Sequence, residues 1–301
     1  SDRIILFGMG QQIGNNNAAY SYDTNTDTWT ALTSFPDPTH EFHDNAMAYL
    51  GIAEQSYTGS IWHVSVNGSD IAGNGSELLP FLTIQNAVTM AGSGDTVKLA
   101  PGEFLENVIF NHDTLTVMAE AGGVAIVNGN NIESCFIIDS SQVDIFNISF
   151  TNGSVQTWPK NGSGIRYNES IGKVKGCKLY ENNSTVEGSG AGGIGISYSH
   201  VDIDSCDIYE NSAADIGGGI SYVWASGDVT NTMISGNIAY GADPRGGGGV
   251  AIWHSSVSLA HNLIHTNSAA RGGGIWIQSI SSLDVLNCTI TENSASERSG
   301  G

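Results

Sequence analysis

The sequence predicts an all-β fold in which short strands coil into a parallel solenoid, and three observations support this. A spaced pattern, apolar-x-apolar-x-x-Cys-x-Ile-x-x-Asn, is clearest at 201–211, and its end position recurs at 153, 182, 211, 237, 267 and 293. A glycine run and a period-two strand precede most copies. The composition, 39 glycines with 13% charged residues, is typical of a turn-rich β-structure.

The repeated core predicts which side chains face inward. No single unit can bury its apolar side chains, but stacked units pair each strand with its copy on the next rung, about 4.8 Å along the axis. One inward column is then Leu179, Ile208, Ile234, Ile264 and Ile290. The closing asparagines should stack at one corner and pass amide hydrogen bonds between rungs. They are Asn182, Asn211, Asn237, Asn267 and Asn293.

Three of the four cysteines fall in a second inward column. Cys177, Cys206 and Cys288 share one place in the repeat, and Ile148, Thr232 and Asn262 replace them in the other copies. Since no Cys-x-x-Cys spacing occurs, we interpret these thiols as buried filler rather than zinc ligands or redox groups. Only Cys177 and Cys206 lie on adjacent rungs, within reach of a disulfide.

The repeats resemble those of a known family. The units I-Y-E-N-S-A-A-D-I-G-G-G-I (208–220) and H-T-N-S-A-A-R-G-G-G-I (265–275) are similar to repeats of right-handed, pectin-lyase-like parallel β-helix proteins, particularly polymorphic outer-membrane proteins and related adhesins. The resemblance covers roughly residues 60–301. It implies a right-handed β-helix but not one function, because adhesins, polysaccharide lyases, glycoside hydrolases and phage tailspikes share that architecture.

Residues 1–52 differ from the repeats. R-I-I-L-F-G-M-G (3–10), Tyr22-Asp23 before a Thr-Asn-Thr turn, Trp29, Pro36 and A-M-A-Y-L-G (46–51) resemble a single kelch repeat. In the kelch family such a repeat is one four-stranded blade of a propeller. One blade cannot bury both faces, so we expect either that the chain continues a larger protein or that this segment packs on the end of the solenoid.

Residues 53–93 are assigned to a junction and cap, and 94–301 to the parallel β-helix. The segment Pro80 to Val88 is the one convincing helical pattern, ending before Gly92. Together with 94–108 it resembles the N-terminal cap of pectin-lyase-like β-helices, where a short helix covers the open end. The sequence stops within a repeat, so we interpret the chain as a fragment, and self-association through an uncapped C-terminal end stays open.

Charge and hydropathy limit the partners. The net charge of −20 disfavours nucleic acid and anionic membranes as partners. No apolar stretch is long enough to span a bilayer, so membrane insertion is not expected. Acidity of this degree suits an exported or salt-adapted protein, and we therefore expect an extracellular or cell-surface location.

The candidate ligand surface is the edge where the glycine-run strands meet loops of variable length. Arg245 and Arg271 each lie just before a glycine run, which places them in one row along the rungs. Strand alternation turns Trp253 and Trp276 outward beside that row, where an indole can stack on a sugar ring. We predict these four as ligand-binding residues. Two alternatives stay open: the arginines pair with neighbouring carboxylates, or the indoles are covered by a loop or another subunit.

Catalytic signatures are sparse, and no catalytic residue is assigned. The resemblance to lyases of this fold implies an Arg or Lys base with carboxylates or calcium neutralising a uronate, for which Arg271 with Asp215 or Asp243 would be the candidates. The three aspartates of V-D-I-D-S-C-D (201–207) are interpreted as surface acids, so no metal site is predicted, although calcium as a cofactor stays open.

The sequence therefore predicts an exported β-helix that acts in adhesion, scaffolding or glycan binding, with a polysaccharide or cell-surface glycan as partner. The alternative is a polysaccharide lyase acting on acidic, uronate-containing glycans. Whether the chain is an enzyme stays open.

Overall fold

The structure is a computed structural model that describes residues 3–7, 19–23, 28–32, 57–156, 161–186, 190–241 and 245–298. The chain divides into two compact units, 1–56 and 57–301. The described part of the first unit is an antiparallel sheet of β1 (Arg3–Phe7), β2 (Ala19–Asp23) and β3 (Thr28–Leu32). Three such strands do not by themselves show a kelch blade, and Pro36 and 46–51 lie outside the described residues.

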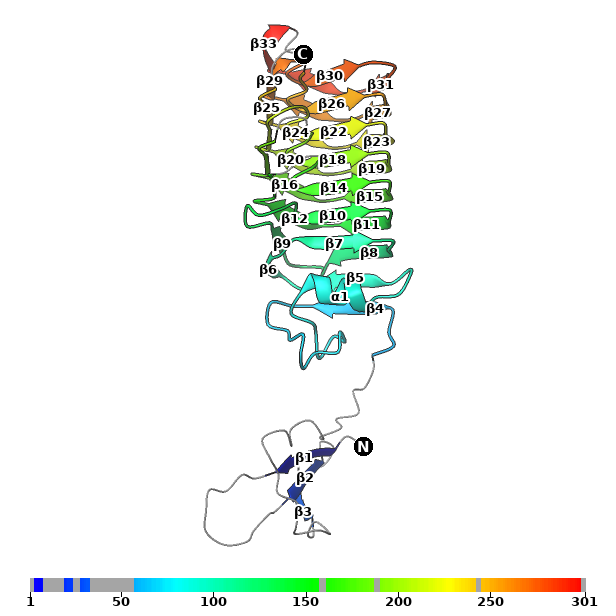
Figure 1. Ribbon diagram of the computed structural model, residues 1–301, viewed down its shortest axis with the longest axis vertical. Helices are drawn as coiled ribbons and strands as arrows, with labels where there is room; N and C mark the ends of the chain where they lie inside the picture. The colour runs from blue at the N-terminus through cyan, green and yellow to red at the C-terminus, as the bar shows by residue number, and fades with distance from the viewer. Residues whose placement is uncertain are drawn as a thin grey trace. The chain divides into compact units, whose positions relative to one another are not determined.

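The second unit is a right-handed parallel β-helix, as predicted. Its described strands stack rung upon rung along one axis and form four parallel sheets (Figure 1). Sheet I contains β7 (Val108–Asn111), β10 (Phe136–Asp139), β14 (Ile165–Asn168), β18 (Ile194–Ser197), β22 (Ile220–Val223), β26 (Val250–Trp253) and β30 (Ile275–Gln278). Sheet II contains β4 (Ile61–Val64), β5 (Thr96–Leu99), β8 (Thr114–Ala119), β11 (Gln142–Phe146), β15 (Ile171–Lys175), β19 (His200–Asp204), β23 (Ser226–Thr230), β27 (Ser256–Ala260) and β31 (Ser282–Leu286).

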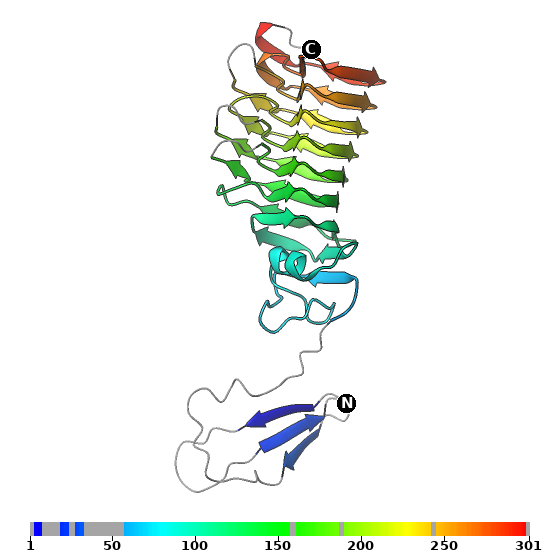
Figure 2. The ribbon, with the colours of Figure 1, turned by 45° about the vertical axis from the view of Figure 1, so that its right-hand side comes forward.

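The other two sheets complete each rung. Sheet III contains β6 (Gly102–Leu105), β9 (Ala125–Asn128), β12 (Ile148–Thr151), β16 (Lys178–Tyr180), β20 (Asp207–Tyr209), β24 (Met233–Ser235), β28 (Leu263–His265) and β32 (Thr289–Thr291). Sheet IV contains β13 (Ser154–Val155), β17 (Asn183–Ser184), β21 (Ser212–Ala213), β25 (Ile238–Ala239), β29 (Ser268–Arg271) and β33 (Ser294–Arg298). A regular rung runs through sheets I, II, III and IV and returns through a glycine run to sheet I. Figure 2 shows the successive rungs stacked along the axis.

The predicted isoleucine column is confirmed. Leu179, Ile208, Ile234, Ile264 and Ile290 are paired in register on neighbouring strands of sheet III. The first four are fully buried, and Ile290 packs partly buried against the same core. Because the strands are parallel and in register, residues one repeat apart in sequence become direct neighbours in space.

The predicted asparagine ladder at the bend between sheets III and IV is also confirmed. Nδ2 of Asn211 donates to Oδ1 of Asn237 at 3.0 Å, and Nδ2 of Asn237 donates to Oδ1 of Asn267 at 2.9 Å. Each Oδ1 also accepts the backbone N–H of the asparagine one rung earlier, as Asn237 does from Asn211 at 3.0 Å. The ladder therefore satisfies backbone groups that the bend removes from the sheets.

The bend between sheets II and III uses the same device with mixed side chains. The Cys206 N–H donates to Oγ1 of Thr232 at 3.2 Å, and the Thr232 N–H donates to Oδ1 of Asn262 at 2.9 Å. Cys177 and Cys206 are buried, and both are free thiols, as is the partly buried Cys288. The interpretation of this column as inward filler is confirmed, and the column is in addition a hydrogen-bonding ladder.

Glycine runs bring neighbouring rungs into close backbone contact before sheet I. The N–H groups of Gly217, Gly218 and Gly219 donate to carbonyls of the next run at 3.2, 3.0 and 3.0 Å. Gly217 has a φ of 67°, and a Cβ on Gly218 would lie 2.5 Å from the Gly248 carbonyl oxygen. Both the left-handed backbone and the lack of space therefore require glycine here.

The predicted capping helix is present as α1 (Ile84–Met90), which buries Ile84, Ala87 and Val88. The hydroxyl of Thr83 accepts the Asn86 N–H, and the Glu106 carboxylate accepts the N–H groups of Ile84 and Gln85 at 2.9 and 3.1 Å. Burial nevertheless raises the pKa of Glu106. Strand β4 lies before α1 and pairs with β5, so the solenoid sheets begin before residue 94. Among the described residues, no helix has the length and hydropathy needed to cross a membrane.

We predict that Asn237→Ala destabilises the central rungs by about 2–3 kcal/mol, because it leaves the buried Asn211 N–H and Ile208 carbonyl without their partner. Urea unfolding followed by circular dichroism measures the loss. Asn183→Ala, at an exposed position on sheet IV, is the matched control and should change stability by less than about 0.5 kcal/mol. Equal losses in the two variants would contradict the ladder's structural role.

The contacts of the Asp204 carboxylate predict that the stability of the fold depends on pH. Its carboxylate accepts hydrogen bonds from Asn231 and Thr230 and pairs with Nζ of Lys175 at 2.8 Å, and these contacts, the Asn231 amide first, hold its pKa well below the usual range. The ionised carboxylate is favoured in the folded state, so its contribution is present above the unfolded pKa of about 3.9 and is lost as pH falls through the folded pKa.

We therefore expect Asp204→Asn to unfold in urea with a smaller loss of stability between pH 7 and pH 3 than the parent protein. Asp284→Asn, at an exposed aspartate of the same sheet, is the control and should keep the parental acid dependence. A parental pH profile in Asp204→Asn would show that this carboxylate does not govern acid stability.

Candidate functional site

The bend between sheets I and II exposes aromatic side chains at left-handed backbone positions. Tyr198, Trp224 and His254 occupy this place on three successive rungs with φ values of 50°, 54° and 49°. At the other two bends the equivalent positive-φ residues are Asn147, Gly176, Ser205, Asn231, His261 and Asn287, and Asn152, Glu181, Glu210, Gly236, Thr266 and Glu292. Left-handed backbone costs non-glycine residues roughly 1–2 kcal/mol, and asparagine and glycine tolerate it best.

Trp224 and His254 stack along the solenoid axis, and Tyr198 lies one rung before Trp224; these three residues are here called the aromatic row. Trp224 and His254 are stacked, with centroids 3.9 Å apart and planes 8° from parallel. Trp253, at the end of β26, contacts His254 with centroids 5.7 Å apart, and its Nε1 donates to the Ser279 hydroxyl at 3.0 Å. Tyr198 is 60% exposed and Trp224 50% exposed, so ring surface remains available to a ligand.

Tyr198, Trp224 and His254 form one wall of a shallow open groove of about 820 Å³, here called the corner groove. The first residues of the sheet II strands, among them His200 and Ser226, form the other wall, and Glu169 adds one carboxylate. Ser199 and Ala225 lie between the two walls. No lysine or arginine lines this groove of the described chain.

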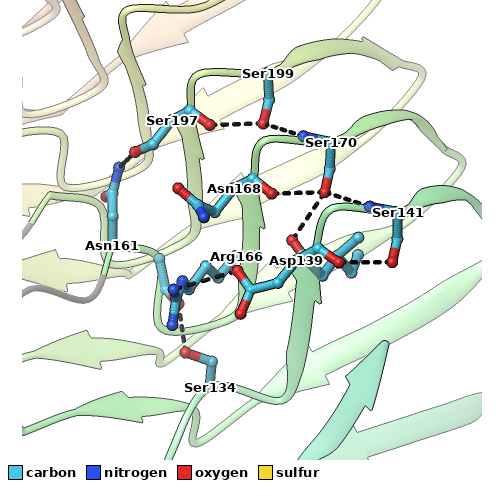
Figure 3. A network of polar contacts seen from close by, with 11 residues as sticks. Ser134, Asp139, Ser141, Asn161, Arg166, Asn168, Ser170, Ser197 and Ser199 are labelled. Atoms are coloured by element: carbon cyan, nitrogen blue, oxygen red, sulfur yellow. Dashed lines mark hydrogen bonds and ion pairs between the residues drawn. The ribbon is translucent and has the colours of Figure 1, made fainter. Parts of the chain in front are cut away.

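A third ladder, made of serines, runs along the groove lining, and Figure 3 shows its members Ser141, Ser170 and Ser199. The Ser170 hydroxyl accepts the Ser141 N–H at 3.0 Å, and the Ser199 hydroxyl accepts the Ser170 N–H at 2.9 Å. Each hydroxyl also donates to the carbonyl two residues earlier, as Ser199 does to Ser197 at 2.6 Å. These bonds fix the backbone that carries the aromatic row.

The polar wall contains a serine and a histidine, and an aspartate outside the groove lining lies near the histidine. Nδ1 of His200 lies 2.9 Å from the Ser226 hydroxyl, and its Nε2 lies 3.6 Å from Oδ1 of Asp202. Nucleophilic hydrolases use the same three residue types, but there the aspartate forms a buried hydrogen bond with the histidine. Here 3.6 Å exceeds a hydrogen bond and the imidazole is 55% exposed. The geometry of His200, Ser226 and Asp202 therefore differs from that of a nucleophilic triad.

The structure separates the four residues predicted from the sequence. Trp253 is 39% exposed and contacts His254, which lines the corner groove, whereas Trp276 is 9% exposed and packs against Ile216 and Ala251. The expectation of an exposed Trp276 indole is wrong. The side chain does point out of the helical core, but a loop from an earlier rung covers it, which is one of the two alternatives the sequence left open.

Loops cover much of the outer face of sheet I, and this explains the small residues there. The Asn161 side chain donates to the Ser197 hydroxyl and accepts from the Ser221 hydroxyl, both at 2.9 Å. Figure 3 shows the Ser197 contact beside the Arg166–Asp139 ion pair of 3.2 Å. A Cβ on Gly195 would lie 2.5 Å from the Asn161 backbone. A side chain that points outward from a sheet I strand is therefore not necessarily exposed to solvent.

The two predicted arginines lie at the loop edge. Nη1 of Arg245 is 2.6 Å from the Asp215 carboxylate, which is 7% exposed, so this arginine is engaged in an ion pair as the other alternative anticipated. Arg271 ends β29, where its backbone pairs with Arg298 and bridges to Gly246. Neither arginine lines the corner groove.

Sequence reasoning missed Tyr198, His200 and Glu169. A signal was available for two of them, because each of these repeats places one residue between a sheet I strand and the ladder residue, and that column gives Glu169, Tyr198, Trp224 and His254. His200 lies outside this column, as the first residue of β19. Within the described ranges, no three His, Cys, Asp or Glu side chains gather as metal ligands would. The aspartates of 201–207 have separate partners, consistent with surface acids.

Comparison with known proteins gives no family. No protein-family model matches the chain, and no curated protein does either. A pectate lyase, Pel9A, is 14% identical, covering 83% of this chain and 80% of its own, at a TM-score of 0.35. A rhamnogalacturonan lyase is 12% identical over 77% and 87% at 0.36, and XylC in complex with xylose is 12% identical over 76% and 69% at 0.34. Likenesses this low carry no argument about function.

We predict that Trp276→Ala destabilises the fold by about 3 kcal/mol, because it removes a buried indole from its contacts with Ile216 and Ala251. Trp253→Ala is the matched control and should cost less than about 1 kcal/mol, since that indole is partly exposed. Thermal unfolding of the two variants measures both losses of stability. A larger loss in Trp253→Ala would contradict this assignment of the packed and the exposed indole.

Proposed function

We propose that the chain is a glycan-binding β-helix that holds an oligosaccharide along the corner groove. The observation that carries the proposal is the placement of Tyr198, Trp224 and His254 at left-handed bend positions on three successive rungs. Asparagine or glycine would suit that backbone better, and these residues occupy many equivalent positions at the other bends. Strain retained in exposed aromatic residues supports a binding role, because packing does not require them there.

The groove suits an extended sugar chain. Its rings follow the solenoid axis with one ring per rung, about every 4.8 Å. Aromatic faces contact the apolar faces of sugar rings, and His200, Ser226 and Glu169 supply polar partners on either side for hydroxyl groups. Trp253, predicted from the sequence, extends the aromatic wall beside His254.

The proposal places the protein outside the cell or at a cell surface, in adhesion or scaffolding, where a repeated surface binds glycan without turning it over. The acidic composition supports such a location. The alternative, a lyase acting on uronate glycans, depended on loop arginines. Arg245 is paired with Asp215, Asp243 lies outside the described residues, and no arginine of the described residues lines the groove, so these contacts favour binding.

We expect Trp224→Asn to abolish or strongly weaken retention of the protein on glycan columns while keeping stability within about 1 kcal/mol of the parent, because asparagine suits the left-handed backbone. Affinity electrophoresis and a panel of immobilised neutral and uronate polysaccharides measure retention. His261→Asn makes the same kind of change at an exposed left-handed position of another bend, and it should leave retention unchanged.

Two results would overturn the proposal. One is parental retention of Trp224→Asn on every glycan that the parent binds. The other is release of unsaturated ends from a uronate polysaccharide, which identifies a lyase and can be followed by absorbance in the same panel.

A further inference from the structure

The serine ladder beneath the corner groove lacks one hydroxyl. The ladder residues on successive rungs are Ser141, Ser170, Ser199, Ala225, Ser255 and Ser281. The backbone N–H groups of Ser141, Ser170, Ala225 and Ser255 each donate to a serine hydroxyl on the next rung. The Ser199 N–H lies beside Ala225 instead, and in the described part of the chain no acceptor pairs with it.

This N–H group is an unsatisfied donor in a sheltered place that borders the groove. Ser199 is 7% exposed and Ala225 8% exposed, and both line the groove. A sheltered N–H without an acceptor is unfavourable and rare in folded proteins. The gap also lies directly after Trp224, at the centre of the aromatic row.

The gap presents an acceptor as well as a donor. One rung later the Trp253 carbonyl accepts both the Trp224 N–H at 3.0 Å and the Ser255 hydroxyl at 2.8 Å. The equivalent Val223 carbonyl accepts the Tyr198 N–H at 3.1 Å, but residue 225 has no hydroxyl to donate to it. The missing group would thus both accept and donate, which a hydroxyl does and an ionised carboxylate does not.

The charge of the groove lining also favours an uncharged sugar. Glu169 lines the groove and no lysine or arginine does, so a uronate carboxylate would meet a like charge and no cationic partner within the described lining. An uncharged sugar carries hydroxyls that match the gap and ring faces that match Trp224.

We propose that the gap left by Ala225 is a ligand subsite in which a hydroxyl of an uncharged sugar completes the serine ladder, accepting from the Ser199 N–H and donating to the Val223 carbonyl. This inference rests on the proposed glycan-binding function and adds the substrate class, neutral rather than uronate glycans. It also makes residue 225 a determinant of affinity.

The test is Ala225→Ser, which supplies the missing hydroxyl from the protein itself. We expect the midpoint of urea unfolding to rise, because the ladder is then continuous. Affinity should fall about tenfold, the equivalent of one to two hydrogen bonds, because the subsite is filled. Cellohexaose and chitohexaose are the neutral probes and hexagalacturonate is the acidic probe, each measured by calorimetry against parent, Ala225→Ser and Trp224→Asn proteins.

Ala260→Ser is the matched control, since it adds the same hydroxyl at an outward position of sheet II away from the ladder, and it should change neither quantity. Unchanged affinity of Ala225→Ser for the neutral probes, or no rise in its unfolding midpoint, overturns the subsite. Preference of the parent for hexagalacturonate overturns the substrate class. If the parent binds none of the three probes, or Trp224→Asn binds them as the parent does, the proposed function fails first, so the two failures are distinguishable.

Discussion

The interaction on which the structure depends is a hydrogen bond between rungs, from a backbone N–H at a bend to an inward polar side chain of the next rung. Strand pairing satisfies the sheets, but a bend takes its amide out of the sheet and would leave it unpaired inside the coil. Asn237, Thr232 and Ser199 solve this at three bends with one geometry, because each accepts from the rung before it. A coil of short strands thereby keeps its interior polar groups satisfied through many turns.

The hydrogen-bonding ladders leave a neighbouring position at each bend open to many side chains. Except before Ser281, the residue that precedes a ladder residue adopts left-handed backbone and turns outward, where core packing places no demand on its side chain. At two bends these positions hold largely polar residues and glycine, whereas at the bend between sheets I and II three successive rungs hold Tyr198, Trp224 and His254, flanked by Ser140 and Glu169 before them and Ser279 after them. Stability and surface chemistry are therefore assigned to adjacent residues, so the outward one can change without disturbing the ladder. The groove and the ladder share Ser170, Ser199, Ala225, Ser255 and Ser281, and of these only Ala225 carries no hydroxyl.

The loops add a further layer that strand alternation does not describe. Segments between sheets IV and I fold over the outer face of sheet I, so Ala251 and Trp276 are outward in the strand but buried in the molecule. The Arg245–Asp215 ion pair lies at the same edge. The exposed aromatic and polar side chains of the corner groove lie at the bend between sheets I and II, beyond these loops.

The sequence by itself determined the solenoid, the isoleucine column, the asparagine ladder and the capping helix. In-register parallel stacking turns a repeat in sequence into neighbours in space, so periodicity alone identified Ile234 beside Ile264 and Asn237 beside Asn267. Only the tertiary structure decided which outward side chains stay exposed. Trp253 and Trp276 both lie in sheet I strands of the repeat, yet Ile216 from an earlier rung covers one of them, and no local pattern encodes that contact. The same holds for Ala225, an ordinary residue in the sequence whose missing hydroxyl matters only because the Ser199 N–H lies beside it.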